Sequence, residues 1–181
     1  MYFPEKKITL KDGRTAIFRG PRPEDAEDAL EYMRLTASET PFLLRGPEEV
    51  LMSVEDEAQY LARSAESRTE MMILCFVDGR LAGNCQINRK KKRKNAHRGS
   101  IGIAIIREFW NLGIGTAMFT ELISAAKQWG LLQLELEVIE GNQRAMALYR
   151  KMGFETVSYV PNAIRMPDGT FEKEYLMIKQ L

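Results

Sequence analysis

SIGIAIIREFWNLGIGTAMFTELISAAKQWG, residues Ser100 to Gly130, is the stretch that decides the fold. It begins with an isoleucine-rich run that is typical of a buried inner strand. Arg107 to Leu112 interrupt that run with charged and polar residues, and Gly113 and Gly115 then open an amphipathic helix. Glycine lets the backbone come close to a ligand, and the first N–H groups of a helix carry partial positive charge. The stretch therefore predicts a site for a phosphate or pyrophosphate group.

The spacing of these glycines separates different kinds of phosphate loop. A Walker loop places a lysine after its last glycine, where this chain has Thr116. A Rossmann loop needs a third small residue where Met118 stands and a glycine turn directly after the strand. It also needs an acid about 20 residues further on, which Glu135 supplies. The Walker loop is excluded, and the Rossmann loop is kept as a rival interpretation.

The rest of the chain alternates strand and helix patterns around this stretch. Asp78-Gly79 is the strongest hairpin signal, and Asn142 and Gly153 are suited to begin and to end a helix. The expected strands are Thr15–Gly20, Met71–Val77, Arg80–Asn88, Ile101–Ile106, Leu131–Val138, Phe154–Tyr159 and Tyr175–Lys179, and the expected helices are about Glu24–Ser38, about Val54–Ser64, the central helix after Gly113, and Asn142–Gly153. No repeat or linker divides them, so we expect one α/β domain over residues 1–181.

Composition limits the class of protein. At 181 residues, of which 45% are hydrophobic, the chain is long enough for one domain with a sizeable core. No apolar run approaches the roughly 20 residues of a membrane helix, so we expect a cytoplasmic protein without membrane contact. Cys75 and Cys85 lie in apolar runs and, with one histidine, offer no zinc spacing, so we expect reduced core thiols and no metal. The sequence leaves a homodimer open.

Two motifs in the right order resemble those of the GNAT N-acetyltransferases. The glycine stretch is similar to motif A of that family, Gln/Arg-x-x-Gly-x-Gly/Ala, with Trp110 in place of Gln or Arg. The second motif, N-x-x-A-x-x-L-Y-x-x-x-G-F, is similar to motif B and consists here of Asn142, Ala145, Leu148, Tyr149, Gly153 and Phe154. The resemblance covers roughly Ile17 to Lys179. It implies a mixed, mostly antiparallel sheet of about seven strands with about four helices, splayed between the strands before and after the central helix.

The resemblance also implies acetyl-CoA as the acyl donor and a set of cofactor-binding residues. The pyrophosphate would be held by the backbone N–H groups of Asn111, Leu112, Gly113, Ile114, Gly115 and Thr116. The backbone near Ile105 and Ile106 would pair with the pantetheine arm, and Asn142 would bond that arm or serve only as the helix cap.

Tyr149 and Glu137 are the candidate catalytic residues. The resemblance places the helical tyrosine of the family at Tyr149, where a phenol can protonate the leaving thiolate, with a core tyrosine whose hydroxyl lies at the surface as the alternative. Many GNAT members carry a base where this chain has Ser100, which cannot do that work. Glu137 is the preferred substitute, with Glu135, Glu140 and His97 behind it, or with a water chain as the base.

The basic run Arg89 to Lys94, RKKKRK, makes an otherwise acidic chain nearly neutral at a net charge of +1. It contains no aromatic residue, so we expect no nucleic-acid binding and interpret the run as a solvated hairpin tip. As a functional alternative, it would draw in the CoA 3′-phosphate or an acidic partner by long-range attraction.

The predicted activity is acetyl transfer from acetyl-CoA to an amine of a small molecule or peptide through a direct ternary complex. Thr40–Val50 and Pro161–Lys173 are expected to line the acceptor pocket. The alternative is a non-catalytic acyl-CoA-binding or RNA-associated regulatory module.

Overall fold

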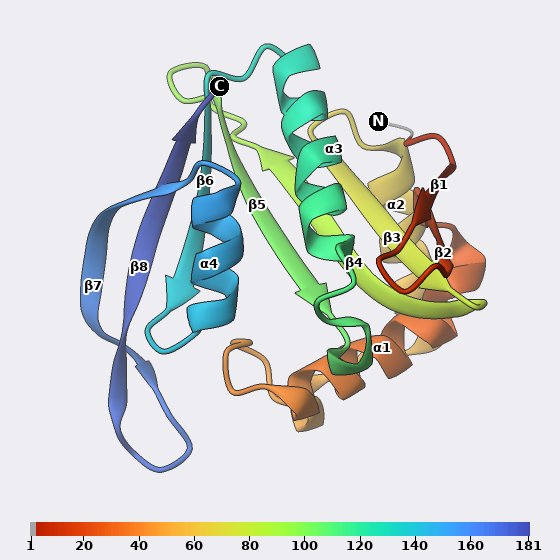
Figure 1. The fold of residues 1–181 in the computed structure, drawn as a ribbon, viewed down its shortest axis with the longest axis horizontal. Coiled ribbons are helices and arrows are strands. Elements are labelled where there is room, and N and C mark those ends of the chain that lie inside the picture. Colours follow the sequence, from red (N-terminus) through yellow and green to blue (C-terminus); the bar gives the residue numbers. More distant parts are fainter. Residues whose placement is uncertain (1–2) are drawn as a thin grey trace.

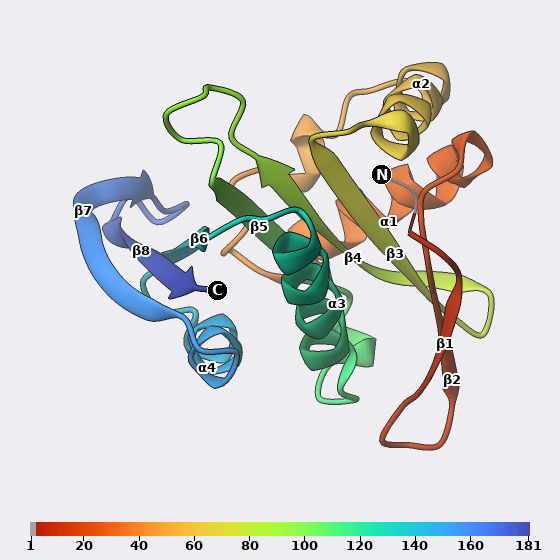
Figure 2. The same cartoon turned by 90° about the horizontal axis from the view of Figure 1, so that it is seen from above.

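A computed structural model describes residues 3–181, in which eight strands form one sheet with helices on both faces (Figure 1). The strands are β1 Lys6–Thr9, β2 Thr15–Arg19, β3 Glu70–Val77, β4 Arg80–Arg89, β5 Arg98–Ile105, β6 Gln133–Ile139, β7 Glu155–Arg165 and β8 Phe171–Gln180. The helices are α1 Ala26–Glu39, α2 Val54–Glu66, α3 Ile114–Gln128 and α4 Gln143–Lys151, with short 3₁₀ turns at Pro23–Asp25, Pro47–Glu49 and Arg107–Phe109. Helices α1 and α2 cover one face of the sheet and α3 and α4 the other (Figure 2).

The sheet has the order β1-β2-β3-β4-β5-β6-β8-β7, and only β5 and β6 run parallel. That parallel ladder has three residue pairs and ends at Ser100↔Glu135, after which the two strands diverge (Figure 1). Helix α3 connects them across the face of the sheet. The predicted mixed, mostly antiparallel sheet that is splayed around the central helix is confirmed, and the parallel sheet of a Rossmann fold is excluded.

The core forms where the apolar stripe of α3 meets the sheet. Met118, Phe119 and Leu122 are fully buried there, at the three-to-four-residue spacing that puts side chains on one helix face. On the opposite side of the sheet, α1 buries Ala29 and Tyr32. Because α1 and α3 pack on β4 from opposite faces and α3 also packs on β5, the end of β5 is held beside the opening between β5 and β6.

Strand β1 was not predicted from the sequence, and β7 and β8 were predicted to be shorter than they are. Strand β1, with the sequence KKIT, lacks a run of apolar residues and pairs only with β2. The predicted loop Pro161–Lys173 is wrong over most of its length, because β7 continues to Arg165 and β8 begins at Phe171. Strand β7 lies at the edge of the sheet, where a proline such as Pro161 removes no ladder bond that the sheet needs.

Several local predictions are confirmed. Asp78 and Gly79 both have positive φ, 52° and 79°, as the tight hairpin between β3 and β4 requires. Cys75 and Cys85 are buried free thiols. None of the helices in residues 3–181 is long and apolar enough to cross a membrane.

Candidate active site

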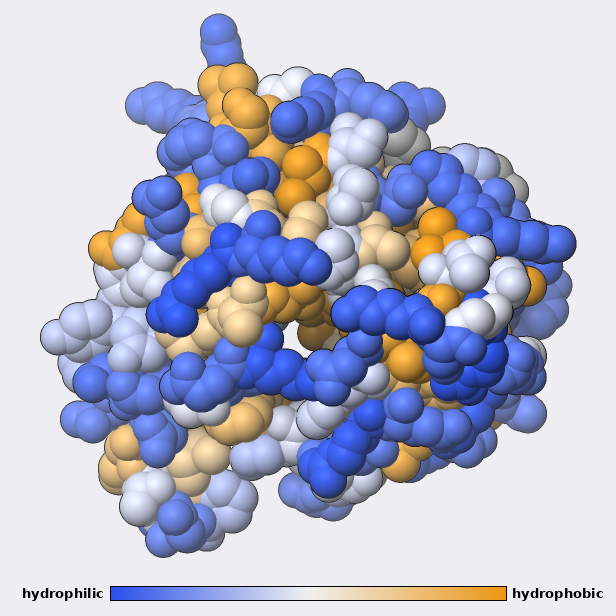
Figure 3. All heavy atoms as spheres, in the orientation of Figure 1, coloured by the Kyte–Doolittle hydropathy of each residue, from blue (hydrophilic) through white to orange (hydrophobic). Residues whose placement is uncertain are grey.

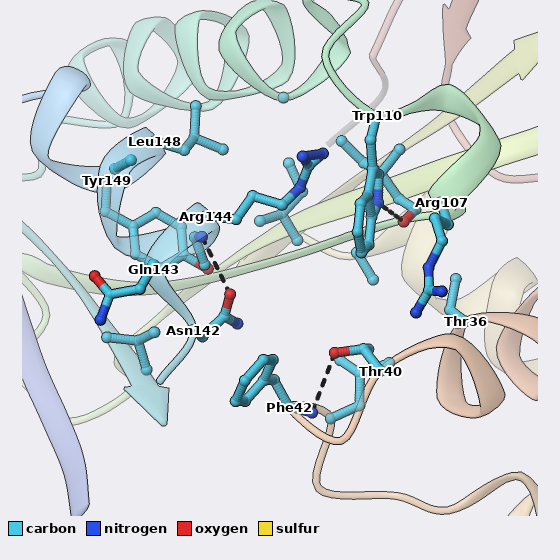
Figure 4. Close-up of a pocket in the computed structure, with 18 of the residues that line it drawn as sticks. Thr36, Thr40, Phe42, Arg107, Trp110, Asn142, Gln143, Arg144, Leu148 and Tyr149 are labelled. Atoms are coloured by element: carbon cyan, nitrogen blue, oxygen red, sulfur yellow. Dashed lines mark hydrogen bonds between the residues drawn. The ribbon is translucent and has the colours of Figure 1, made fainter. Parts of the chain in front are cut away.

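A cleft of about 1020 Å³ lies where β5 and β6 diverge. Its walls come from the N-terminus of α3, from α4, and from residues 39–44 at and after the end of α1. Figure 3 shows a hollow at the centre of one face, bordered by hydrophilic side chains, and Figure 4 shows the side chains that converge there. Of the two segments expected to line an acceptor pocket, 40–50 contributes and 161–173 does not, because the latter folds into the β7–β8 hairpin.

The glycine loop turns the chain from β5 into α3. Asn111 and Gly113 both have positive φ, 65° and 98°, and Gly113 is the N-cap residue of the helix. The N–H groups of Ile114, Gly115 and Thr116 belong to the first turn, so they have no acceptor within the helix. Such a helix terminus, at the mouth of a cleft, suits a pyrophosphate group.

Gly115 is a glycine for a reason that the sequence did not suggest. A Cβ atom at this position would lie 2.9 Å from Leu148 Cδ2 of α4. The absence of a side chain at Gly115 therefore lets α3 and α4 pack closely, whereas the backbone turn is the work of Gly113. A substitution at Gly115 would test helix packing before it tested phosphate binding.

The structure brings most of the predicted cofactor residues to the cleft, with two exceptions. Those that line it are Ile105, Asn111, Gly113, Ile114, Gly115, Thr116 and Asn142. Leu112 does not line it, and its carbonyl accepts a hydrogen bond from Lys11 at 3.1 Å. Ile106 is buried, and its N–H donates to Ala82 on β4 at 2.9 Å, away from the cleft.

Three cationic side chains lie around the glycine loop, and all three were missed in the sequence analysis. Arg144 Nη1 donates to Asn111 Oδ1 at 3.1 Å, and Lys151 Nζ donates to Thr116 Oγ1 at 3.2 Å. Lys11 lines the cleft from the β1–β2 turn. The only sequence signal for the first two was their separation of two helical turns, which places both on one face of α4.

Trp110 occupies the motif position that the resemblance assigned to Gln or Arg. Its Nε1 donates to the carbonyl of Ile105 at 2.6 Å. The guanidinium carbon of Arg144 lies 3.9 Å from its ring centroid, that of Arg107 lies 5.4 Å away, and Figure 4 shows the ring between the two arginines. Burial lowers the pKa of Arg144. The indole thus ties the glycine loop to the end of β5 and positions two cations at the cleft.

Tyr149 lies on the buried side of α4 and lines the cleft (Figure 4). Asn142 begins this helix as predicted, because its side chain accepts a hydrogen bond from Ala145 N at 3.1 Å. Gly153 follows the helix with φ of 84°, as expected for a left-handed stop. Burial raises the pKa of Tyr149 to about 12. The side chain is therefore both a core residue and a neutral phenol beside the cleft.

Among the described residues, three carboxylates line the cleft, those of Glu39, Glu137 and Glu174, and only Glu137 was predicted. Glu137 of β6 is exposed there, and Glu174 of β8 joins it. Glu137 pairs with Leu176, two residues from Glu174, so the two carboxylates lie on the same face of the sheet. Burial raises the pKa of Glu174, and the charge of Glu137 raises it further. Glu174 was missed in the sequence analysis because its position beside Glu137 depends on the pairing of β6 with β8, which the sequence does not reveal.

The other candidate bases do not line the cleft. Glu135 is buried and forms ion pairs with Arg98 and, at 3.3 Å, with Lys90, which explains a carboxylate on an inner strand. Glu140 accepts hydrogen bonds from Tyr175 and Lys173, and these bonds lower its pKa. His97 is exposed in the turn before β5.

Comparison with known proteins gives this fold and cleft a family. The model of the acetyltransferase (GNAT) family matches residues 29–154. L-amino acid N-acetyltransferase AaaT of Escherichia coli K12 is 28% identical over 111 residues, which span 61% of this chain and 67% of that protein. An N-alpha-acetyltransferase of Sulfurisphaera tokodaii is 34% identical over 82 residues, which span 45% of this chain and 47% of that relative. The crystal structure of a GNAT-family acetyltransferase from Streptococcus pneumoniae is 28% identical, with a TM-score of 0.86 over 92% of this chain and 99% of that one.

The chain therefore belongs to the acetyltransferase (GNAT) family. It is an N-acetyltransferase that takes its acetyl group from acetyl-CoA.

Proposed function

We propose that the protein acetylates the amine of a small molecule, with acetyl-CoA and the amine bound together in the cleft between β5 and β6. The observation that carries this proposal is the open edge of β5. It runs from the β6 pairing to the N-terminus of α3, with Tyr149, Glu137 and Glu174 beside the same cleft. The residues at one end of the cleft suit the binding of a pyrophosphate, and residues further inside the cleft suit proton transfer.

The cleft has groups suited to bind both the phosphates and the pantetheine arm of acetyl-CoA. The N–H groups of Ile114 to Thr116, together with Lys11, Arg144 and Lys151, would bind the phosphates. The backbone of β5 that faces β6 beyond Ser100 has no strand partner and would pair with the pantetheine arm. Because the Ile105 carbonyl already accepts from Trp110 and the Ile106 N–H donates to β4, this pairing would rest mainly on the residues before them.

The acceptor nitrogen must lose one proton before it attacks the thioester and a second proton afterwards. The acceptor ammonium first loses a proton to Glu137 or Glu174, directly or through water, and becomes a nucleophilic amine. Its nitrogen attacks the thioester carbon, the C–S bond breaks, and the nitrogen loses a second proton. The Tyr149 hydroxyl donates a hydrogen bond to the thiolate as it departs, and the thiolate then takes up a proton. The products are an amide, free CoA and one proton.

Glu137 is our candidate for the base, and Glu174 is a second carboxylate on the same face of the sheet. Replacement of Glu137 by Gln is expected to lower turnover most at low pH, where too little of the amine is neutral. Unchanged turnover across the pH range would remove Glu137 from the mechanism and leave water or Glu174 as the base.

The experiment that tests the function is a CoA-release assay with a panel of amines, in which the products are identified by mass spectrometry. We expect at least one class of amine to accelerate release, with N-acetyl product and free CoA formed in equal amounts. If acetyl-CoA binds but no amine accelerates release, the chain is an acyl-CoA-binding module and the proposal fails.

A further inference from the structure

The guanidinium group of Arg107 forms no ion pair with a carboxylate within residues 3–181, although the Glu39 carboxylate lies beside its backbone. Arg107 lines the cleft directly after β5, and its side chain is exposed. Its Nη2 donates to the backbone carbonyl of Glu39, while the Glu39 carboxylate accepts from the backbone N–H of Arg107 at 2.6 Å. A neutral carbonyl thus orients the guanidinium group without neutralising it. Since that group has five N–H donors, most of its capacity for hydrogen bonds remains.

The β6–β8 side of the same cleft has the opposite character. Glu137 and Glu174 share a face of the sheet there, and neither forms an ion pair in the part of the chain that the structure describes. Two neighbouring carboxylates repel each other, and the raised pKa of Glu174 reflects this in part. A cation bound near them would relieve the repulsion.

We infer that the acceptor is a free amino acid, whose ammonium group is recognised by Glu137 and Glu174 and whose carboxylate is bound by Arg107. The inference rests on the proposed function and deepens it. A guanidinium fork matches the two oxygens of a carboxylate, and Arg107 on one side with Glu137 and Glu174 on the other matches the two charges of a zwitterion.

The same charges distinguish a free amino acid from a peptide N-terminus. In a peptide the first α-carboxylate is replaced by a neutral amide, which would leave Arg107 with no anion to bind. Both acceptor types appear among the relatives, one of which is named for L-amino acids and the other for N-alpha-acetylation. Arg107 favours the first.

The test compares the 20 L-amino acids with the carboxamide of each, in CoA-release assays of the wild-type protein. Hydrogen bonds between charged groups are strong, so kcat/KM for the preferred amino acid should exceed that of its carboxamide by roughly tenfold or more. Equal values for the two would overturn the inference, whereas no acetylation of any amine would overturn the proposed function together with it.

Variants then assign the effect to Arg107. R107Q should raise KM for the amino acid by roughly tenfold or more and leave kcat/KM for the carboxamide nearly unchanged, while R107K should recover part of the loss because it keeps the charge without the fork. The acetyl-CoA Kd of each variant, measured by calorimetry, should match that of the wild type. The matched control is R150Q, an exposed arginine of α4 that does not line the cleft. An equal loss for amino acid and carboxamide would make Arg107 a structural residue and overturn its assignment.

Discussion

Tyr149 packs its ring against Phe119 and Phe154, with centroid separations of 5.5 and 6.4 Å. The same burial that makes it a core residue raises the pKa of its hydroxyl to about 12. A thiol has an ordinary pKa of about 8.5, so full transfer of the Tyr149 proton to a free thiolate is uphill. The hydroxyl is better suited to stabilise the thiolate by a hydrogen bond as the C–S bond breaks, with protonation following.

Replacing Tyr149 with Phe is expected to lower kcat by roughly 10²-fold, because it removes a donor that is needed only as the thiolate leaves. The acetyl-CoA Kd should stay nearly constant, since the groups proposed to bind the cofactor lie elsewhere. Steady-state kinetics and calorimetry on the same preparations check both expectations. Turnover at the wild-type rate would mean that Tyr149 only packs.

At the scale of elements, α4 shows what could and could not be predicted from the sequence. Its cap at Asn142, its stop at Gly153 and its inward Tyr149 follow from local signals that act within a few residues. The positions of Arg144 beside Asn111 and of Glu174 beside Glu137 depend on how α4 packs on the glycine loop and how β8 pairs with β6. No periodicity within one segment contains that information.

The β4–β5 connection corrects the interpretation of the basic run. Lys90 pairs with the buried Glu135, so only the later part of the run is a solvated tip. We expect K90Q to destabilise the fold by no more than roughly 1 kcal/mol. The effect stays small because Arg98 remains to pair with Glu135. K92Q is the matched control, since Lys92 is exposed and has no ion-pair partner among the described residues. Equal unfolding midpoints in urea for the two variants would show that the Lys90 pair contributes nothing.

Helix α2 buries a carboxylate that lacks a full set of partners. Glu57 is 3% exposed, its Oε2 has no hydrogen-bond partner in residues 3–181, and burial raises its pKa above the ordinary 4.5. The folded state therefore binds the Glu57 proton more tightly than the unfolded state does. Stability that is present at low pH is lost as the pH rises from the unfolded pKa through the folded one.

The substitution E57Q removes this loss, because glutamine is neutral at every pH. We expect a higher Tm than wild type at pH 7 and a difference that shrinks towards pH 4. E55Q is the control, since Glu55 is exposed in the same first turn of α2. Thermal unfolding followed by circular dichroism measures both, and a lower Tm for E57Q at pH 7 would contradict the assigned cost of burial.

At the scale of the whole molecule, the cleft exists because β5 and β6 separate beyond Ser100 and Glu135, along a line that we call the seam. The three residue pairs between β5 and β6 hold the sheet together at one end of the seam. Helices lie on both faces of the half that contains β3 to β5, and α4 lies on one face of the other half (Figure 2). We propose that residues 1–181 form one domain that unfolds cooperatively. The general plan was predictable because two motifs in the right order resemble those of the GNAT family, which implies this sheet, whereas the chemistry of the acceptor wall arises from contacts between distant segments.

The central claim is that acetyl-CoA binds in the seam between β5 and β6, and calorimetric titration of acetyl-CoA into wild type, R144Q and R150Q tests it most directly. Wild type should bind one equivalent, and at ~100 times the Kd the ligand should stabilise the fold by about 2.7 kcal/mol. Loss of a charge-assisted contact to phosphate should weaken binding to R144Q by roughly tenfold, while R150Q, whose arginine lies outside the cleft, should match the wild type. No binding to the wild type, or equal affinity for all three proteins, would contradict this location of the cofactor.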